Sequence, residues 1–309
     1  MTRKIPFALF MVMVFFVVCT KTPAENTSTA DGTAAPEVSE KSPGENQRKS
    51  LREYLPVLLE KNPLTGKKTL ALVDDDRMFA ESFTAYAGFL EDATVVNNTP
   101  DGKAVRKVGE DLRRAAEKWL AAEGRPDYFE KYKWEYNLVE SPEVNAWCMP
   151  GGKIVVYTGI LPVTGNNDGL ATVMGHELAH ALLNHGRQQR SAEILRTIGG
   201  IATDIITFVA GADAETRKGA EIIYDLGSTY LASLPFSRKH ETEADEVGLI
   251  LMTIAGYKSE ESIAFWTRMS EMNGSKAPAF LSTHPSNKQR VANLSESISN
   301  AKETASRIR

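Results

Sequence analysis

The chain has 309 residues, of which 25% are charged and 42% hydrophobic, and these values are typical of a globular protein that can bury a sizeable core. The formal net charge is −4. Nucleic-acid-binding proteins usually carry a basic stripe, so this charge argues against a nucleic-acid partner.

The N-terminus has the pattern of an export signal. Two basic residues precede an uncharged apolar run, Ile5–Val18, which is shorter than the roughly 20 residues of a membrane-spanning helix. Cleavage after Ala24 would release a soluble protein, cleavage before Cys19 would allow its lipidation, and an uncleaved anchor is a third alternative. We therefore expect residues 1–24 to be a signal peptide or lipoprotein signal, and the protein to be exported, either to the periplasm or to a membrane surface.

Residues 25–48 are rich in Thr, Ser, Ala, Pro, Gly and Glu and lack aromatic residues. This composition is typical of a disordered linker, which suits a protein that stands off a membrane. Beyond it we expect an N-terminal helical region at 49–127 and a second domain at 128–309.

The helical region begins with apolar residues at helical spacing from about 47 to 60. Residues 64–100 show no clear pattern and are left unassigned. An amphipathic helix is predicted over 102–123, closed by Gly124.

The pattern then changes to a period of two. Aromatic and aliphatic residues alternate with polar ones over Tyr132–Leu138, and a β-rich run, Lys153–Thr158, follows a turn at Pro150-Gly151-Gly152. These runs predict a small antiparallel sheet or hairpin beside a helical body. The fold class is therefore α+β and mainly helical.

Helical patterns occupy most of the remaining chain. Asp168 and Gly186 are the predicted start and stop of one helix, and Ser237 and Gly256 those of another. Residues 192–212 are apolar and Gly-rich but contain charged residues, which favours a mobile or amphipathic helix over a membrane span. The predicted helices are 169–185, 192–212, 237–255, 260–273 and 286–306.

The segment His176-Glu177-Leu178-Ala179-His180 carries the strongest chemical signal. Two histidines four apart on a helix differ by about 40° around its axis and lie one turn apart along it, so both can ligate one metal ion. Neutral imidazole suits zinc, and Glu177 can serve as general base toward a water molecule at the metal. A catalytic zinc ion needs a third protein ligand, and residues 238–245 offer several candidates.

This sequence, HELAH followed by SRKHETEAD, resembles metallopeptidase family forty-eight, whose members are gluzincins, and in particular its OMA-like and BepA-like exported branch. The resemblance implies that Glu241 of the Glu-x-x-Ala-Asp motif is the third ligand and that one zinc ion binds per chain. Asp245 lies on the same helix face as Glu241 and could accept a hydrogen bond from a ligand histidine.

Two more segments extend the resemblance. Residues 145–152 resemble the family's edge strand, which implies that Asn145, Gly151 and Gly152 bind the substrate backbone. The segment Ser282–Ser286 resembles the late His-Pro motif, which implies that His284 either stabilises the oxyanion or takes the fourth zinc position in a closed state. A structural role for His284 at a helix entry is the alternative.

The resemblance predicts a zincin-type metalloprotease with its active-site helix beside the small sheet. It would hydrolyse unfolded or extended polypeptides, such as misfolded or unassembled envelope proteins, with peripheral or lipid-anchored membrane association. The alternatives are a periplasmic chaperone or assembly factor that retains zinc with little proteolysis, and an adaptor with a structural zinc site. We expect His185 and His240 to face away from the metal, and Cys148 to be a small buried apolar residue.

Overall fold

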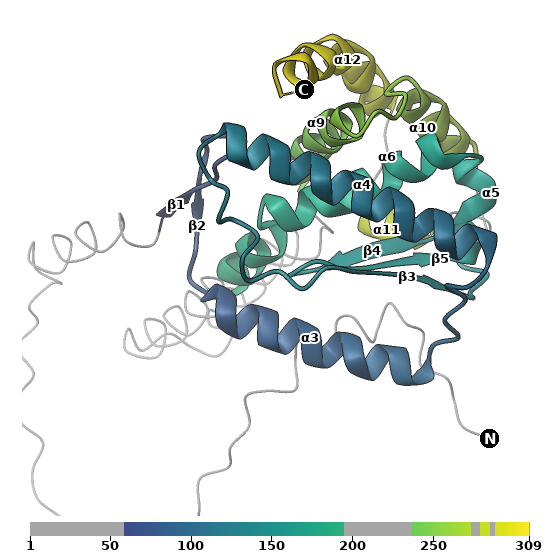
Figure 1. The fold of residues 1–309 in the computed structure, drawn as a ribbon, viewed down its shortest axis with the longest axis horizontal. Helices are drawn as coiled ribbons and strands as arrows, with labels where there is room; N and C mark the ends of the chain where they lie inside the picture. The colour runs from purple at the N-terminus through teal and green to yellow at the C-terminus, as the bar shows by residue number, and fades with distance from the viewer. Residues whose placement is uncertain (1–58, 195–236, 273–278, 285–287, 309) are drawn as a thin grey trace, which may run out of the picture. The chain divides into compact units, whose positions relative to one another are not determined.

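We describe a computed structural model of the chain, which covers residues 59–194, 237–272, 279–284 and 288–308 (Figure 1). The predicted signal, the linker, most of the predicted helix at 47–60 and most of that at 192–212 lie outside these residues. Within the described part of the chain, no helix combines the length and the apolar character that crossing a bilayer requires.

The described chain begins with a two-stranded hairpin. Strands β1 (Leu59–Lys61) and β2 (Lys68–Leu70) pair in antiparallel register, so the end of the predicted helix at 47–60 is wrong. The turn between them is closed by the Asn62 side chain, which accepts hydrogen bonds from the backbone N–H groups of Leu64 and Thr65. This turn and the cross-strand pairing outweigh the local helical spacing.

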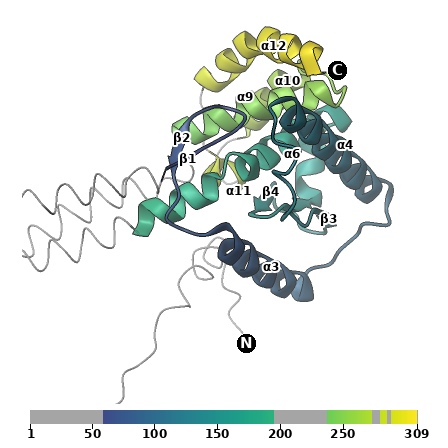
Figure 2. The same cartoon turned by 60° about the vertical axis from the view of Figure 1, so that its left-hand side comes forward.

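Two long helices follow the hairpin. Helix α3 (Asp75–Asp92) lies in the segment that the sequence left unassigned, and the Asp74 carboxylate caps its N-terminus. Helix α4 (Pro100–Ala122) agrees with the predicted 102–123, and the Thr99 hydroxyl caps it. In Figures 1 and 2, α3 lies on one side of the central sheet and α4 on the other.

The central sheet has three strands in the order β3–β5–β4. Strands β4 (Ala146–Met149) and β5 (Lys153–Tyr157) form an antiparallel hairpin. The two runs expected to pair in antiparallel fashion, which contain β3 (Glu135–Val139) and β5, instead pair in parallel, so the sheet is mixed. The reason is that β4 precedes β5 as its hairpin partner, and β5 then lies between β4 and β3.

Strand β4 is left at one edge of the sheet. The opposite edge, β3, is bonded to the chain before α4, since Val96 N–H donates to the Leu138 carbonyl and Glu140 N–H to the Thr94 carbonyl. After β5, a 3₁₀ turn (Thr158–Ile160) and α5 (Leu161–Thr164) lead into α6 (Asn167–Leu182), which packs against β4.

Helix α6 has different ends from those predicted. Asn166, not Asp168, is its N-cap, because the Asn166 side chain accepts from Gly169 N–H at 2.9 Å. The helix stops at Leu182, and Asn184 adopts a left-handed conformation with φ 54°. A new helical segment then runs through 185–194, so Gly186 does not end a helix.

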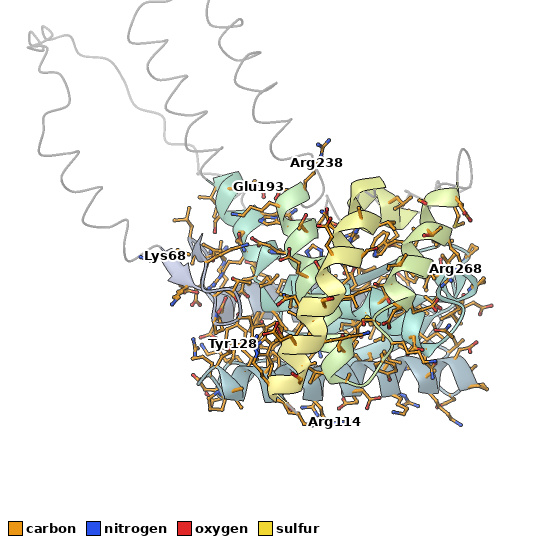
Figure 3. All side chains as sticks on the ribbon, turned by 90° about the horizontal axis from the view of Figure 1, so that it is seen from above. Lys68, Arg114, Tyr128, Glu193, Arg238 and Arg268 are labelled. Carbon is orange, nitrogen blue, oxygen red and sulfur yellow. The ribbon has the colours of Figure 1, made fainter. Side chains whose placement is uncertain are left out.

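Helices α9, α10 and α12 agree closely with the sequence patterns, whereas the short helix α11 was not predicted. Helix α9 has Ser237 as its N-cap, as predicted. Helix α12 packs along α9, and charged side chains such as Arg114 and Arg238 point outward (Figure 3). The bounds are Arg238–Ile254 for α9, Glu261–Glu271 for α10, Ala279–Thr283 for α11 and Lys288–Ile308 for α12.

Helices α6 and α9 cross unusually closely at two glycines, Gly175 and Gly248, and we call this contact the glycine crossing. A Cβ atom added to Gly248 on α9 would lie 2.9 Å from the Gly175 carbonyl carbon and 2.9 Å from the His176 nitrogen. Only hydrogen fits at this position, so the two backbones touch next to His176. Glu241 lies seven residues before Gly248, about two turns earlier on the same side of α9, and so reaches the metal motif of α6.

Candidate metal centre and active site

Four side chains from three segments converge beneath this crossing. His176 and His180 come from α6, Glu241 from the first turn of α9, and His284 from the residue after α11. Their potential ligand atoms lie within 4.8 Å of one another, and all four residues are buried. The chain thus assembles a three-nitrogen, one-carboxylate group, and burying it unpaired would be costly.

The spacing of these atoms fits a small tetrahedral ion. The Nε2 atoms of His176 and His180 are 3.1 Å apart, and His284 Nδ1 lies 3.2 Å from His176 Nε2. The Glu241 carboxylate lies 3.3 Å from His180 Nε2 and 3.4 Å from His176 Nε2. Ligands about 2.0–2.2 Å from a tetrahedral zinc ion are roughly 3.3–3.5 Å apart. Both the donor set and its spacing therefore suit zinc.

Two further side chains, Asp245 of α9 and Arg290 of α12, contact the candidate ligands. Asp245 Oδ1 lies 3.0 Å from His176 Nδ1, the contact expected for it from the sequence. Arg290 donates to Asp245 at 2.6 Å and to the Glu241 carboxylate at 3.0 Å. Burial opposes charge on Glu241, but His176 and the bonds from its neighbours hold the pKa of that carboxyl well below its usual range. Glu241 is thus kept as an anion, the form that ligates a metal.

Glu177 lies between the metal cluster and the sheet edge. One carboxylate oxygen accepts a hydrogen bond from Cys148 N–H on β4 at 3.1 Å, and the other is 3.4 Å from His284 Nε2. Burial raises the pKa of Glu177 above its usual value. A carboxylate that is buried, basic and outside the ligand group has the properties of a general base.

The edge of β4 is covered in this structure. Asn145 folds its side-chain oxygen onto the N–H of Ala146 at 2.9 Å, and Phe280 N–H on α11 donates to the Val144 carbonyl at 3.1 Å. Together with the bond from Cys148 to Glu177, these contacts occupy polar backbone groups along the edge. In Figures 1 and 2, α11 lies beside β4. The segment that carries His284 therefore rests against the predicted substrate-binding strand.

The two glycines after β4 have a structural explanation. Gly151 and Gly152 have φ values of 82° and 90°, and a Cβ atom at either would lie 2.6 Å from the ring of Phe83 or of Trp134. The turn and its aromatic packing account for both residues. Their role in substrate binding remains a prediction.

His185 is the residue that the sequence placed wrongly. It is fully buried, and its Nδ1 lies 2.9 Å from His180 Nδ1. The prediction assumed an unbroken helix, whereas the left-handed turn at Asn184 brings His185 back toward the metal ligands. His240 stacks on the His185 ring with centroids 4.3 Å apart. Cys148 is half-buried and is not among the four side chains that could hold a metal ion.

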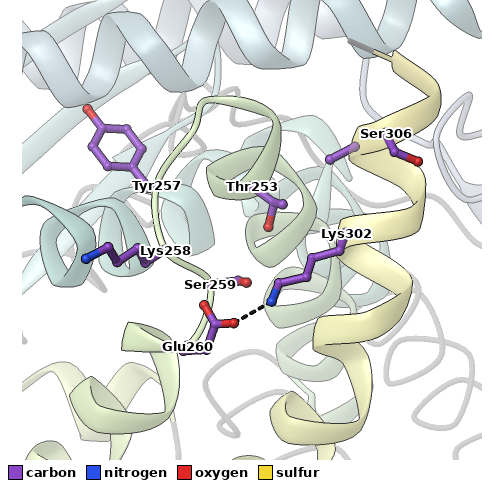
Figure 4. A pocket seen from close by; sticks show the side chains of 8 residues that line it. Thr253, Tyr257, Lys258, Ser259, Glu260, Lys302 and Ser306 are labelled. Carbon is purple, nitrogen blue, oxygen red and sulfur yellow. Dashed lines mark hydrogen bonds and ion pairs between the residues drawn. The ribbon is translucent and has the colours of Figure 1, made fainter.

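Cavity size does not locate this site. One cavity in the described part of the chain measures about 300 Å³ and lies between the α9–α10 connection and α12, where Glu260 pairs with Lys302 (Figure 4). None of the metal-cluster residues lines it. Another measures only about 10 Å³ and borders His176 and Asp245. The chemistry of the side chains, rather than a large hollow, marks the functional centre.

A helix bearing His-Glu-x-x-His beside a mixed sheet, with a glutamate ligand from a second helix, defines a metallopeptidase of the zincin type. The model of peptidase family M48 matches residues 107–298. The chain therefore belongs to peptidase family M48, and the family and fold class predicted from the sequence are confirmed.

Named relatives include proteins of mitochondria and of bacteria. The chain is 37% identical to the mitochondrial metalloendopeptidase OMA1 of Schizosaccharomyces pombe over 60% of this chain and 51% of the relative. It is 23% identical to metalloprotease YcaL of Escherichia coli over 77% of this chain and 94% of the relative. It is 25% identical to a putative beta-barrel assembly-enhancing protease of Vibrio cholerae over 54% of this chain and 35% of the relative. The chain thus spans only about half of the OMA1 protein.

Proposed function

We propose that this protein is a zinc metalloendopeptidase that cleaves unfolded or unassembled polypeptides of the cell envelope. The observation that carries the proposal is the position of Glu177, which touches the β4 edge on one side and faces the four-residue cluster on the other. A base held between a metal site and a strand edge is what hydrolysis of an extended peptide requires.

The ligands of the proposed zinc ion are His176, His180 and Glu241. When bound, zinc would supply Lewis-acid polarisation of the substrate carbonyl and lower the pKa of a water molecule. Glu177 accepts the proton of the attacking water and later returns it to the leaving amine. Asp245 holds His176 through Nδ1, so that Nε2 faces the ion.

Substrate recognition is proposed to use the backbone of β4. An extended peptide that pairs with an edge strand binds through main-chain hydrogen bonds, with little side-chain selectivity. Asn145 would release the Ala146 N–H and bind the incoming backbone in its place. Such recognition suits substrates whose main chain is exposed because they are unfolded or unassembled.

We propose that this arrangement is a closed, self-inhibited state. His284 Nδ1 lies 3.2 Å from His176 Nε2 and 3.1 Å from a Glu241 oxygen, which supports a role for His284 as fourth ligand in that state. We propose that His284 and α11 leave the cluster and the β4 edge before a substrate enters. Of the two roles expected for His284, we thus propose the fourth zinc position, and only for the closed state.

The proposed location is the cell envelope, with the N-terminal apolar run as export signal or anchor. Two findings support it: the pattern of Ile5–Val18 and the similarity to a relative named for β-barrel assembly. Residues 25–48 would then give the catalytic domain reach from the membrane surface.

Cleavage of casein by the purified chain, with zinc measured in the same samples, tests the proposal. We expect wild type to cleave, Glu177→Gln to be inactive, and both to hold one zinc ion per chain. Glu246→Gln is the matched control, because it makes the same change at an exposed position of α9. Zinc binding without cleavage, both in wild type and in a His284→Ala variant, would indicate the chaperone alternative. Absence of zinc from wild type would refute the site.

A further inference from the structure

A series of contacting side chains, buried except for its last member, leads from the metal cluster to the β1–β2 turn. His180 Nδ1 lies 2.9 Å from His185 Nδ1, and His185 Nε2 lies 3.4 Å from one oxygen of Glu243. The other oxygen of Glu243 lies 2.6 Å from Lys67 Nζ. The mechanism proposed above uses none of the last three residues.

One proton arrangement satisfies every contact. His180 presents Nε2 to the cluster, so its Nδ1 carries a hydrogen and donates it to His185 Nδ1. His185 must then carry its own hydrogen on Nε2, which points at the Glu243 carboxylate. Lys67 donates to the remaining oxygen of that carboxylate. Glu243 therefore fixes the tautomer and ring orientation of His185, His185 fixes those of His180, and Lys67 orients the Glu243 carboxylate.

The side chains of His185, Glu243 and Lys67 come from three separate segments of the sequence. The left-handed turn at Asn184 delivers His185, which is 0% exposed. Glu243 is two residues beyond the ligand Glu241 and points to the other side of α9. Lys67 comes from the β1–β2 turn, next to Gly66 with φ 65°. The hairpin lies outside residues 107–298, the part that matches the family model.

We propose that His185 is a positioning residue for the ligand His180, and that Glu243 and Lys67 hold His185 in place. The β1–β2 hairpin is then part of the metal site. The inference rests on the proposed function only in requiring that a metal ion binds at the cluster. Partners of this kind usually change metal affinity by about 10–100-fold when removed.

The expected loss of zinc affinity is largest for His185, which contacts the ligand His180, and smaller for Lys67, which is farther along the series. His185→Phe keeps a ring but offers no acceptor to His180, so we expect zinc to bind about 10–100-fold more weakly. His185→Gln restores an acceptor oxygen and should recover most of that loss. Lys67→Met should have a smaller effect, because the Lys67 side chain is 49% exposed and its ion pair is partly solvated.

The experiment measures zinc dissociation constants of the full chain by competition with a chromophoric chelator, together with the visible spectrum of the cobalt-substituted protein. Lys68→Met is the matched control, since Lys68 lies on the same hairpin and is exposed (Figure 3). We expect unchanged affinity and cobalt spectrum for this control. If His185 served folding alone, His185→Phe would lower the melting temperature of the metal-free protein, and His185→Gln would not recover the loss.

Equal dissociation constants and spectra for wild type and His185→Phe would overturn the inference while leaving the proposed function intact. Failure of wild type to bind zinc would overturn both. Should His185→Phe not fold, Glu243→Leu carries the test, because it leaves His185 in place and removes the acceptor oxygen that orients its Nε2. An unchanged zinc affinity in a folded Glu243→Leu protein would also refute the positioning role.

Discussion

Arg290 lies flat on Trp266, with its guanidinium carbon 3.4 Å from the centre of the indole ring. The same guanidinium contacts the carboxylates of Asp245 and Glu241. It is 5% exposed, so it forms a buried network of one cation and two anions beside the metal ligands. Such a group stabilises only when every charge is paired and the cation is held in shape, which the stack on Trp266 provides.

Replacing Arg290 should destabilise the protein, because two buried carboxylates lose the cation that pairs with them. We expect Arg290→Met to lower the free energy of unfolding by about 3–5 kcal/mol, because both anions lose their buried partner. Arg290→Lys should fall between, since lysine supplies the charge but neither the two-pronged bond nor the stack. Urea unfolding measures this. Arg114→Met, at a surface ion pair, should cost less than about 1 kcal/mol, and equal losses for both sites would contradict the network.

His284 should restrain activity rather than supply it. If the closed state with His284 on the cluster is about 90% populated, His284→Ala should raise cleavage of a short quenched peptide roughly tenfold. Ser282→Ala, an exposed change on the same short helix, should leave the rate unchanged. A large fall in kcat for His284→Ala would instead assign His284 to oxyanion stabilisation.

The glycine crossing of α6 and α9 should tolerate no side chain. Gly248→Ala places a methyl group 2.9 Å from α6 backbone atoms that cannot move aside, so we expect a loss of about 1–3 kcal/mol in stability and weaker zinc binding as Glu241 shifts. Gly88→Ala on α3 is the matched control, because no atom lies within 4 Å of its Cβ. That change should stabilise the protein by about 0.5–1 kcal/mol. The prediction fails if both variants gain stability.

The parts of the site that could be predicted are those set by local geometry. Helical spacing alone brings His176 and His180 together, whereas Glu241 and His284 are far away in sequence and were reached only through resemblance to a family. His185 was misjudged because one left-handed residue, Asn184, ends the helix that the spacing argument extended. The parallel pairing of β3 with β5 depends on which strand returns between two others, which no local pattern encodes.

Helix α3 was missed although its signals were present. Asp74 caps it, two acidic residues open its first turn, and apolar residues recur at helical spacing. The mixed composition of residues 64–100 concealed them. Residues 64–100 contain part of a hairpin, a helix and a loop, so no single pattern runs through the segment.

Burial lowers the pKa of His240 to about 4, and the neighbouring His185 acts in the same direction. The sign of the effect on stability follows from proton counting. Between pH 6.5 and 4 the unfolded chain binds a proton at this histidine and the folded chain does not, so stability falls as the pH falls through this window. His240→Phe keeps a ring against His185 but cannot take up the proton. We therefore expect its stability to decline less between pH 7 and 5.

Melting temperatures of the metal-free proteins measure this difference, because acid would release zinc from the loaded ones. Lys258→Gln is the control, since Lys258 is exposed and is not among the charges that shift the pKa of His240. His180 is also buried, and its pKa is lowered by desolvation, so it contributes a decline of the same sign to all three proteins. Only the difference between His240→Phe and the others reports on His240. Parallel declines in all three would show that His240 stays solvated enough to titrate normally.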